Sequence, residues 1–232
     1  TISPNNSLYA YNNVGRIYRY NLLTDQFELY LDLAEHIYMG LVLHYLFIDS
    51  QEQLWIGLNS GLYCCLLGET PQLIDSDCHV TYITELPQSM AIGTTCDLRI
   101  YSKDRNLLQK LCPDTYVQSL LPLPNKEILL IGTFNCGVKS ISLSSWQEQP
   151  VKNGSLPHTP IRSMIEMTPS TVLLGFDGDG VYTYNLSSGE AEPLFTRTNR
   201  MLTAMGVYSL CRDCEDNIWI GTYTGGAFLM MP

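Results

Sequence analysis

Few residues in this chain have the types and spacing that chemistry needs. His158-Thr159-Pro160 superficially resembles a kinase phosphoacceptor, but Pro157 and Pro160 flank it, and proline disfavours a helix at that point. A loop is therefore the favoured interpretation. The sequence contains no phosphate-binding P-loop, no dinucleotide fingerprint and no Gly-x-Ser-x-Gly elbow. We predict no catalytic residue and no cofactor.

Two patterns that could bind metal are incomplete. Asp177-Gly178-Asp179-Gly180 resembles the start of a calcium loop, but Ser188 stands at the twelfth position, where an acidic ligand is needed. A plain turn is favoured there over a cation site. Cys211-x-x-Cys214 is a single pair among 8 cysteines, and no second pair completes a zinc site. We expect no metal, and mostly free buried thiols rather than a disulfide framework.

Composition restricts the classes of partner. Hydrophobic residues make up 45% of the 232-residue chain, which indicates a globular protein, and the 15 tyrosines favour strands. The formal net charge is −10 with only 13 Lys and Arg, so nucleic acid and anionic membrane surfaces are disfavoured as partners. A neutral ligand such as a sugar is compatible with this charge. No apolar run approaches the length of a membrane span.

A repeated segment organises the chain. Ile218-Trp219-Ile220-Gly221-Thr222 matches Leu54-Trp55-Ile56-Gly57-Leu58, and an acidic residue, Asp213 or Asp49, stands six positions before each Trp. Weaker copies lie between them. The glycines that anchor the copies, roughly forty residues apart, are Gly57, Gly93, Gly132, Gly175 and Gly221. This period predicts about six repeats, at approximately 1–33, 34–75, 76–112, 113–150, 151–196 and 197–232.

Each repeat divides into short strands separated by turn residues. In the second repeat we expect strands at 45–48, 54–58, 62–66 and 72–74, because Gly, Pro, Asn and Asp interrupt the apolar runs every five to ten residues. Because such breakers leave no long helical period, a helical array is disfavoured. The predicted fold is all-β, a β-propeller of four-stranded antiparallel blades, with residues 1–232 forming about six blades.

The Gly and Trp positions have a structural interpretation. The second strand of a blade is buried on both faces between neighbouring blades, and a Gly at its end admits a close neighbouring backbone or a kink. The favoured interpretation of Trp55 and Trp219 is a wedge between blades, with a ligand-stacking platform as the alternative. The first repeat lacks an inner strand and the last lacks an outer one. We therefore expect a part of a larger propeller.

The pattern Asp-x-x-x-x-Leu/Ile-Trp-Ile-Gly-Thr/Leu-x-x-Gly-Leu/Gly, at 49–62 and 213–226, resembles the two-component regulator propeller repeat. The resemblance implies a periplasmic sensor of a bacterial hybrid two-component system. In that family, tandem propellers precede a membrane span and a cytoplasmic histidine kinase, and many members respond to oligosaccharides. This segment carries no kinase motif and would not itself be an enzyme. Its implied partners are an oligosaccharide, further blades or a second propeller of the parent chain, and a homodimer.

Propeller geometry suggests where a ligand would bind. Hairpins between second and third strands gather on one face with the loops between blades, and aromatic, amide and carboxylate groups there suit a sugar. For each residue singly, turn chemistry remains the favoured interpretation, and Phe134 and Tyr223 are the strongest candidates. The candidate ligand-binding residues are Asn59, Thr95, Phe134, Asn135, Asp177, Asp179, Tyr223 and Thr224.

Three hypotheses remain open. The first is a non-catalytic sensor that binds a glycan fragment or relays its binding. The second is a propeller enzyme acting on polysaccharide, a lyase or glycosidase, which predicts a cluster of His, Tyr and Glu or Asp at the mouth of the channel. The third is a protein-interaction scaffold.

Overall fold

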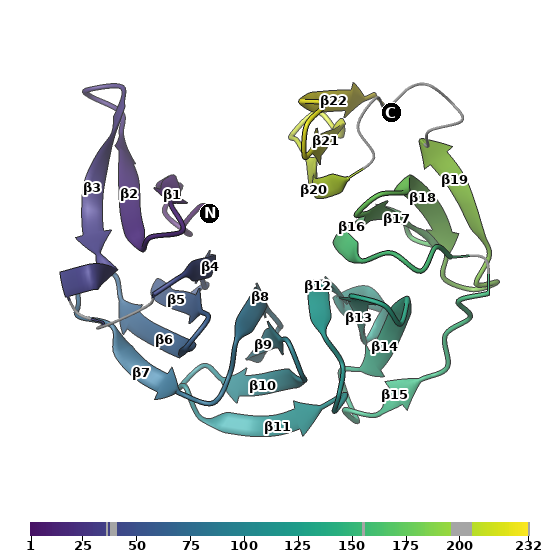
Figure 1. Ribbon diagram of the computed structural model, residues 1–232, viewed down its shortest axis with the longest axis horizontal. Coiled ribbons are helices and arrows are strands. Elements are labelled where there is room, and N and C mark those ends of the chain that lie inside the picture. Colours follow the sequence, from purple (N-terminus) through teal and green to yellow (C-terminus); the bar gives the residue numbers. More distant parts are fainter. Residues whose placement is uncertain (36, 38–40, 155, 196–205, 232) are drawn as a thin grey trace. The chain divides into compact units, whose positions relative to one another are not determined.

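The computed structural model describes residues 1–35, 37, 41–154, 156–195 and 206–231. Those residues form six antiparallel sheets, each built from strands that follow one another in the chain (Figure 1). The only helical elements among them are two short 3₁₀ turns, η1 (Leu33–Glu35) and η2 (Pro124–Lys126). None of their helices is long and apolar enough to cross a membrane. The predicted fold class, all-β with six propeller blades, is confirmed.

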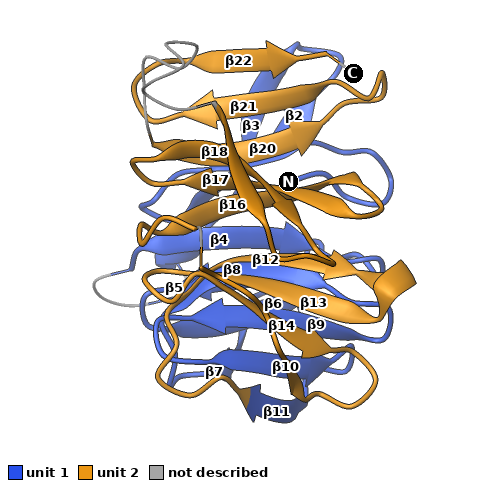
Figure 2. Ribbon diagram, turned by 90° about the vertical axis from the view of Figure 1, so that its right-hand side faces the viewer, with its two compact units in different colours: residues 1–110 blue, residues 111–232 orange. Residues whose placement is uncertain are grey.

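The chain divides into two compact units, residues 1–110 and 111–232 (Figure 2). Unit 1 contains three sheets, which we call blades 1 to 3. Their strands are β1 (Tyr9–Tyr11), β2 (Arg16–Asn21) and β3 (Gln26–Asp32); β4 (Leu43–Ile48), β5 (Gln53–Leu58), β6 (Gly61–Leu66) and β7 (Gln72–Asp75); and β8 (Val80–Glu85), β9 (Ser89–Thr94), β10 (Leu98–Ser102) and β11 (Leu107–Leu111).

Unit 2 contains blades 4 to 6. Their strands are β12 (Val117–Leu123), β13 (Ile128–Thr133), β14 (Val138–Ser142) and β15 (Glu148–Gln149); β16 (Ile161–Thr168), β17 (Thr171–Phe176), β18 (Gly180–Asn185) and β19 (Ala191–Phe195); and β20 (Val207–Arg212), β21 (Ile218–Thr222) and β22 (Ala227–Met230). Blades 1 and 6 have three strands each among the described residues. In blade 1, Ile2 forms an isolated bridge to Leu8, just before β1.

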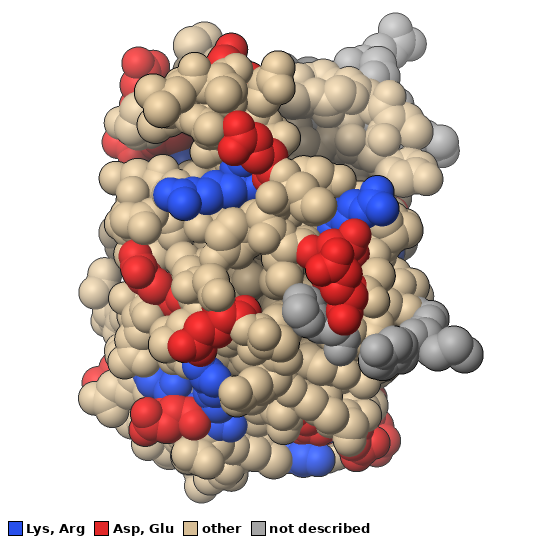
Figure 3. Space-filling model, turned by 90° about the vertical axis from the view of Figure 1, so that its left-hand side faces the viewer, with Lys and Arg blue, Asp and Glu red and all other residues tan. Residues whose placement is uncertain are grey.

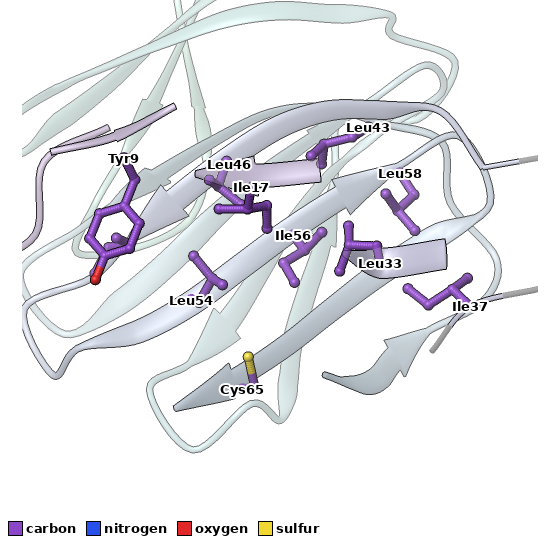
Figure 4. Packing of buried hydrophobic residues seen from close by; sticks show 11 residues of the cluster. Tyr9, Ile17, Leu33, Ile37, Leu43, Leu46, Leu54, Ile56, Leu58 and Cys65 are labelled. Carbon is purple, nitrogen blue, oxygen red and sulfur yellow. The ribbon is translucent and has the colours of Figure 1, made fainter. Parts of the chain in front are cut away.

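The second strand of blade 2 is buried along its whole length, as predicted. Leu54, Ile56 and Leu58 of β5 pack into a cluster with Ile17 and Leu33 of blade 1 (Figure 4). Because successive strand residues point to opposite faces, Trp55 lies on the other side. There it packs against residues of blade 3 that include Val80, Ile83, Met90 and Ile92.

Trp55 and Trp219 share a hydrogen bond that explains the acidic residue six positions earlier. The Trp55 indole Nε1 donates to Asp49 Oδ2 at 2.9 Å, and the Trp219 Nε1 donates to Asp213 Oδ2 at 2.9 Å. Each carboxylate also accepts backbone N–H groups from the residues two and four positions on. The aspartate therefore closes the turn before the second strand and satisfies the indole as the ring leaves water.

The predicted wedge role fits Trp55, which packs between blades 2 and 3, and stays a prediction for Trp219. The Trp55 side chain is fully buried, whereas Trp219 is 45% exposed although its bond to Asp213 is kept. The difference has a simple cause. Blade 3 follows blade 2 within unit 1, but among the described residues of unit 2 no sheet follows blade 6.

Three of the anchoring glycines, Gly57, Gly132 and Gly175, accept a side chain of the next blade. A Cβ built on Gly57 would lie 2.4 Å from Val80 Cγ1, and one on Gly175 would lie 2.7 Å from Val207 Cγ1. Gly132 is likewise close to Ile161, with 2.8 Å to its Cγ2. Val80, Ile161 and Val207 are each the first residue of the following blade's inner strand. A Cβ at these positions would occupy space that the seam between blades already fills.

Every inner strand from blade 2 to blade 6 has a β-bulge opposite its glycine. The register shifts lie at 43/45, 80/82, 117/119, 161/163 and 207/209, and the residue that pairs after each shift faces Gly57, Gly93, Gly132, Gly175 or Gly221. In blades 4 and 6 that residue is a serine whose Oγ occupies the place of the missing Cβ. The Ser119 hydroxyl also donates to the Ile161 carbonyl at 2.7 Å, which joins blades 4 and 5.

A buried ion pair holds blades 2 and 3 together in unit 1. Arg99 of β10 is almost fully buried and donates to Asp75 at 2.7 Å, to Asp97 at 3.0 Å and to the Asp77 carbonyl at 2.5 Å. The Tyr101 hydroxyl donates to the same Asp75 oxygen at 2.5 Å. Burial raises the pKa of Asp75, but the hydrogen bonds from Tyr101, the Asp77 N–H and Arg99 outweigh it, so the pKa lies below 3.8.

All eight cysteines are free thiols, and half of them, rather than most, are buried. Burial raises the pKa of Cys64 and of Cys78 to about 12. The exposed thiols are Cys96, Cys136, Cys211 and Cys214.

We predict that Gly175→Ala destabilises the protein by about 1–3 kcal/mol, because the new methyl group overlaps Val207. Urea unfolding followed by circular dichroism measures the change. Gly154→Ala is the control, since a Cβ there meets nothing within 4 Å. The penalty should shrink in a Val207→Ala background. Equal penalties in both backgrounds would contradict the close approach.

We also predict an acid-sensitive seam. Because the folded pKa of Asp75 lies below its ordinary value, its contribution to stability is complete above about pH 4 and is lost as pH falls through the folded pKa. Asp75→Asn should cost about 1.5–3 kcal/mol at pH 7 and flatten the decline in acid. Asp77→Asn is the control because Asp77 contributes a backbone carbonyl to Arg99. Parallel pH curves for wild type and Asp75→Asn would refute this assignment.

Candidate functional site

The bulges set which side chains stand out at the start of each inner strand. The extra residue at each bulge has no partner on the second strand. Its side chain therefore need not follow the regular alternation of side chains between the two faces of the sheet. In unit 2 these residues are Gln118, Arg162 and Tyr208, one from each blade. Strands β12 and β16 contact each other, as do β16 and β20, so the three side chains lie in a row.

Arg162 is the centre of this row. Its Nη1 donates to Gln118 Oε1 at 2.6 Å, and its Nε and Nη2 both donate to Asp177 Oδ2, at 3.0 and 2.7 Å. Its guanidinium lies 5.1 Å from the centroid of the Tyr208 ring, and the Tyr208 hydroxyl reaches Asp177 at 3.3 Å. Asp177 follows β17 in the hairpin of the same blade. Arg162 therefore bridges three blades of unit 2.

Aromatic rings extend the row on either side. Tyr223 is 75% exposed and stacks on Tyr208, with centroids 5.4 Å apart and planes at 27°. Phe134 is 41% exposed and stacks on Tyr116, with centroids 5.0 Å apart and planes at 11°. Each pair joins a hairpin residue to a residue at or just before an inner strand. We call Gln118, Arg162, Asp177, Tyr208 and Tyr223 the Arg162 cluster.

The structure brings together two of the eight candidate residues, Asp177 and Tyr223, on either side of Tyr208. Thr224 is exposed in the same hairpin as Tyr223. Asp179 lies apart and accepts a bond from the Thr159 hydroxyl at 2.6 Å. Thus both acidic residues of the calcium-like segment have protein donors, and the segment forms the β17–β18 hairpin.

The remaining candidates lie in other hairpins. Phe134 follows β13 beside Asn135, whose side-chain oxygen accepts from the Cys136 thiol at 3.2 Å. In unit 1, Asn59 accepts the Val42 N–H at 2.9 Å, and the Thr95 N–H donates to the His79 carbonyl at 3.1 Å. These hydrogen bonds hold Asn59 and Thr95 to the loops that precede the inner strands of their blades, which is a structural role.

Sequence reasoning missed Tyr116, Gln118, Arg162 and Tyr208. The inner strands were predicted, but each was treated as a regular strand, in which alternate residues share a face. The available signal was position: these residues stand one before or one after the first apolar residue of an inner strand. The bulge itself has no signature in this sequence other than the glycine opposite it.

The electrostatics of the cluster are balanced. Arg162 and Asp177 form an ion pair at 2.7 Å with each side chain 29% exposed. Burial raises the pKa of Tyr208, the charge of Arg162 lowers it and that of Asp177 raises it, and the net shift is upward. Elsewhere, the face in Figure 3 shows few basic side chains, and those lie beside acidic ones. Among the described residues no group of three or more His, Cys, Asp or Glu is placed to hold a metal ion.

This chain is similar to known proteins in its three-dimensional structure. No family model matches the sequence, and no curated protein matches it. The extracellular domain of BT4673 from B. thetaiotaomicron, named as a proposed one component system, superposes with a TM-score of 0.78 at 20% identity over 99% of this chain. A second structure, named as a proposed hybrid two component system, gives 0.78 at 22% identity and also covers 99% of this chain.

A computationally designed protein, Ika8, matches over 97% of this chain and 70% of its own, with a TM-score of 0.67 at 14% identity. The chain spans about a third of the BT4673 domain, 32% and 31% in the two structures. At these identities the likeness establishes the fold. The resemblance to the two-component regulator propeller, first noted in the Trp-Ile-Gly repeats, is therefore confirmed as a match of fold to an extracellular domain named for such a system.

We predict that Arg162 and Asp177 are energetically coupled. A double-mutant cycle with Arg162→Gln and Asp177→Asn should give a coupling free energy of about 0.5–1 kcal/mol, as expected for a half-exposed pair with good geometry. Urea unfolding of the four proteins measures it. Lys139 and Glu148 are the control pair and should couple near zero, because they are 3.3 Å apart and the Glu148 side chain is 53% exposed. A coupling free energy no larger than that of the control pair would show that Arg162 and Asp177 do not stabilise each other.

Proposed function

We propose that this chain is a ligand-sensing propeller region of the periplasmic sensor of a hybrid two-component signal-transduction protein. The ligand is an oligosaccharide, the recognition surface is the Arg162 cluster, and the chain performs no catalysis. The single observation behind the proposal is the arrangement of Arg162 between an amide, a carboxylate and a stacked pair of tyrosines. The extracellular domains of BT4673 support the sensor role by their fold and by the systems for which they are named.

A neutral sugar suits this surface for three reasons. The exposed ring of Tyr223 offers an apolar face of the kind on which a sugar ring can lie. Arg162 and Asp177, whose side chains are each 29% exposed, offer fixed donors and acceptors to hydroxyl groups. The charges of Arg162 and Asp177 compensate each other, and the chain carries a net charge of −10, so an anionic ligand gains nothing from the field.

The enzyme hypothesis has weaker support. Tyr208 and Asp177 are the acid–base candidates of the cluster, and the pKa of Tyr208 is raised. A phenol with a raised pKa is a poor base at neutral pH. Asp177 already accepts two N–H groups from Arg162. The exposed Trp219 fits the alternative role of contact with further blades, a second propeller of the parent chain or a second copy.

The experiment is calorimetric titration of the chain with a panel of neutral and acidic oligosaccharides. We expect one or more neutral members to bind, and Tyr223→Ala to weaken that binding roughly tenfold through the loss of stacking. Arg162→Gln should weaken it as well. Phe27→Ala is the matched control, because Phe27 is an exposed ring that also packs against a tyrosine, Tyr20, but on blade 1.

Three results would overturn parts of the proposal. Equal losses in Tyr223→Ala and Phe27→Ala would move the site away from the Arg162 cluster. Release of new sugar ends during incubation with the panel would establish the lyase or glycosidase alternative. A parent gene without a membrane span and kinase would remove the signalling role.

A further inference from the structure

Unit 1 brings two histidines together at the start of two neighbouring inner strands. His44 is the extra residue at the bulge of β4, and His79 directly precedes β8. Strands β4 and β8 are the neighbouring inner strands of blades 2 and 3, and they contact each other. The pair is separate from the proposed sugar site, whose residues all belong to unit 2.

The two rings converge through the same kind of nitrogen. His44 Nε2 and His79 Nε2 are 2.9 Å apart, whereas the ring centroids are 4.5 Å apart with planes tilted by 39°. The nitrogens are thus the closest parts of the two rings and face a common point. Without a metal, one Nε2 donates a hydrogen bond to the other, and the tautomers decide which ring is the donor.

The backbone around the pair is held in place before any ligand arrives. The His44 carbonyl accepts the Tyr11 hydroxyl at 3.1 Å, and the His79 carbonyl accepts the Thr95 N–H at 3.1 Å. A metal ion binds an imidazole nitrogen through its lone pair.

The separation of the nitrogens selects a coordination geometry. With metal–nitrogen bonds of about 2.0–2.1 Å, nitrogens 2.9 Å apart subtend an angle of about 90° at the metal. Tetrahedral coordination would need them about 3.3 Å apart. Right angles between imidazole ligands are typical of the tetragonal or octahedral sites of Cu²⁺ and Ni²⁺.

We propose that His44 and His79 form a two-histidine site for a divalent transition metal that takes right-angle coordination, Cu²⁺ or Ni²⁺. The metal lies between the two Nε2 atoms, the ring that carried its hydrogen on Nε2 carries it on Nδ1 instead, and water completes the coordination. His44 is exposed to solvent and His79 is half-buried, so the site is open to exchange. Its role is binding, with no redox step.

The test is titration of the reduced chain with Ni²⁺ and Cu²⁺ by calorimetry at neutral pH, together with the electron paramagnetic resonance spectrum of the Cu²⁺ complex. We expect one ion per chain and a Cu²⁺ spectrum split by two nitrogen nuclei. His44→Asn and His79→Asn should each weaken Ni²⁺ binding roughly tenfold or more, and the double variant should lose little beyond either single change. Zn²⁺ should bind more weakly than Cu²⁺ by more than the usual order of affinities, because its preferred angle is wrong.

His158→Asn is the control, since His158 is an exposed histidine of unit 2 outside the pair. Circular dichroism of every variant establishes that it is folded. Binding that survives in the double variant, or a charge-transfer band from copper on an exposed thiol, would assign the metal to other groups and overturn the proposal. Absence of binding by both ions would reduce the pair to an imidazole–imidazole hydrogen bond.

Discussion

Neighbouring blades approach each other most closely where a glycine of one faces the first inner-strand residue of the next. Val80 fits against Gly57, Ile161 against Gly132 and Val207 against Gly175, at distances that leave no room for a Cβ. In the next blade, a bulge follows this β-branched residue. The bulge adds one residue to the inner strand before the position that pairs with the glycine of the same blade. Next to the contact that packs two blades together, one residue of the inner strand is therefore left without a partner on the second strand.

This constraint connects the core to the surface. Gln118, Arg162 and Tyr208 stand at the bulges of unit 2, and His44 and Thr81 stand at those of unit 1. The same backbone device thus presents an amide, a guanidinium and a phenol in one unit and an imidazole and a hydroxyl in the other. Function can change at these positions without disturbing the seams, because the neighbouring apolar residue and the glycine carry the packing.

The sequence was informative about packing and much less so about the surface. The Trp-Ile-Gly copies predicted the strand order and the buried second strand, because burial on both faces demands apolar residues and Gly wherever the seam is tight. The role of Asp49 was not predicted, since a carboxylate before a turn reads equally well as a turn residue. The position of Arg162 at a bulge was not predicted, because a bulge depends on the pairing between strands, which a single sequence does not display. Trp219 has the same sequence motif as Trp55 but is more exposed, because burial of this side chain depends on a following blade.

The fluorescence of single tryptophans tests the seam most directly. In a variant with Trp146 and Trp219 replaced by Phe, the remaining Trp55 reports the contact between blades 2 and 3, while a Trp219-only variant reports the open face of blade 6. Our account predicts blue-shifted emission from Trp55 and acrylamide quenching several-fold weaker than that of Trp219, since Trp55 is fully buried and Trp219 is 45% exposed. Solvent-like emission and equal quenching of Trp55 would contradict the packing between blades 2 and 3 on which this account of the fold depends.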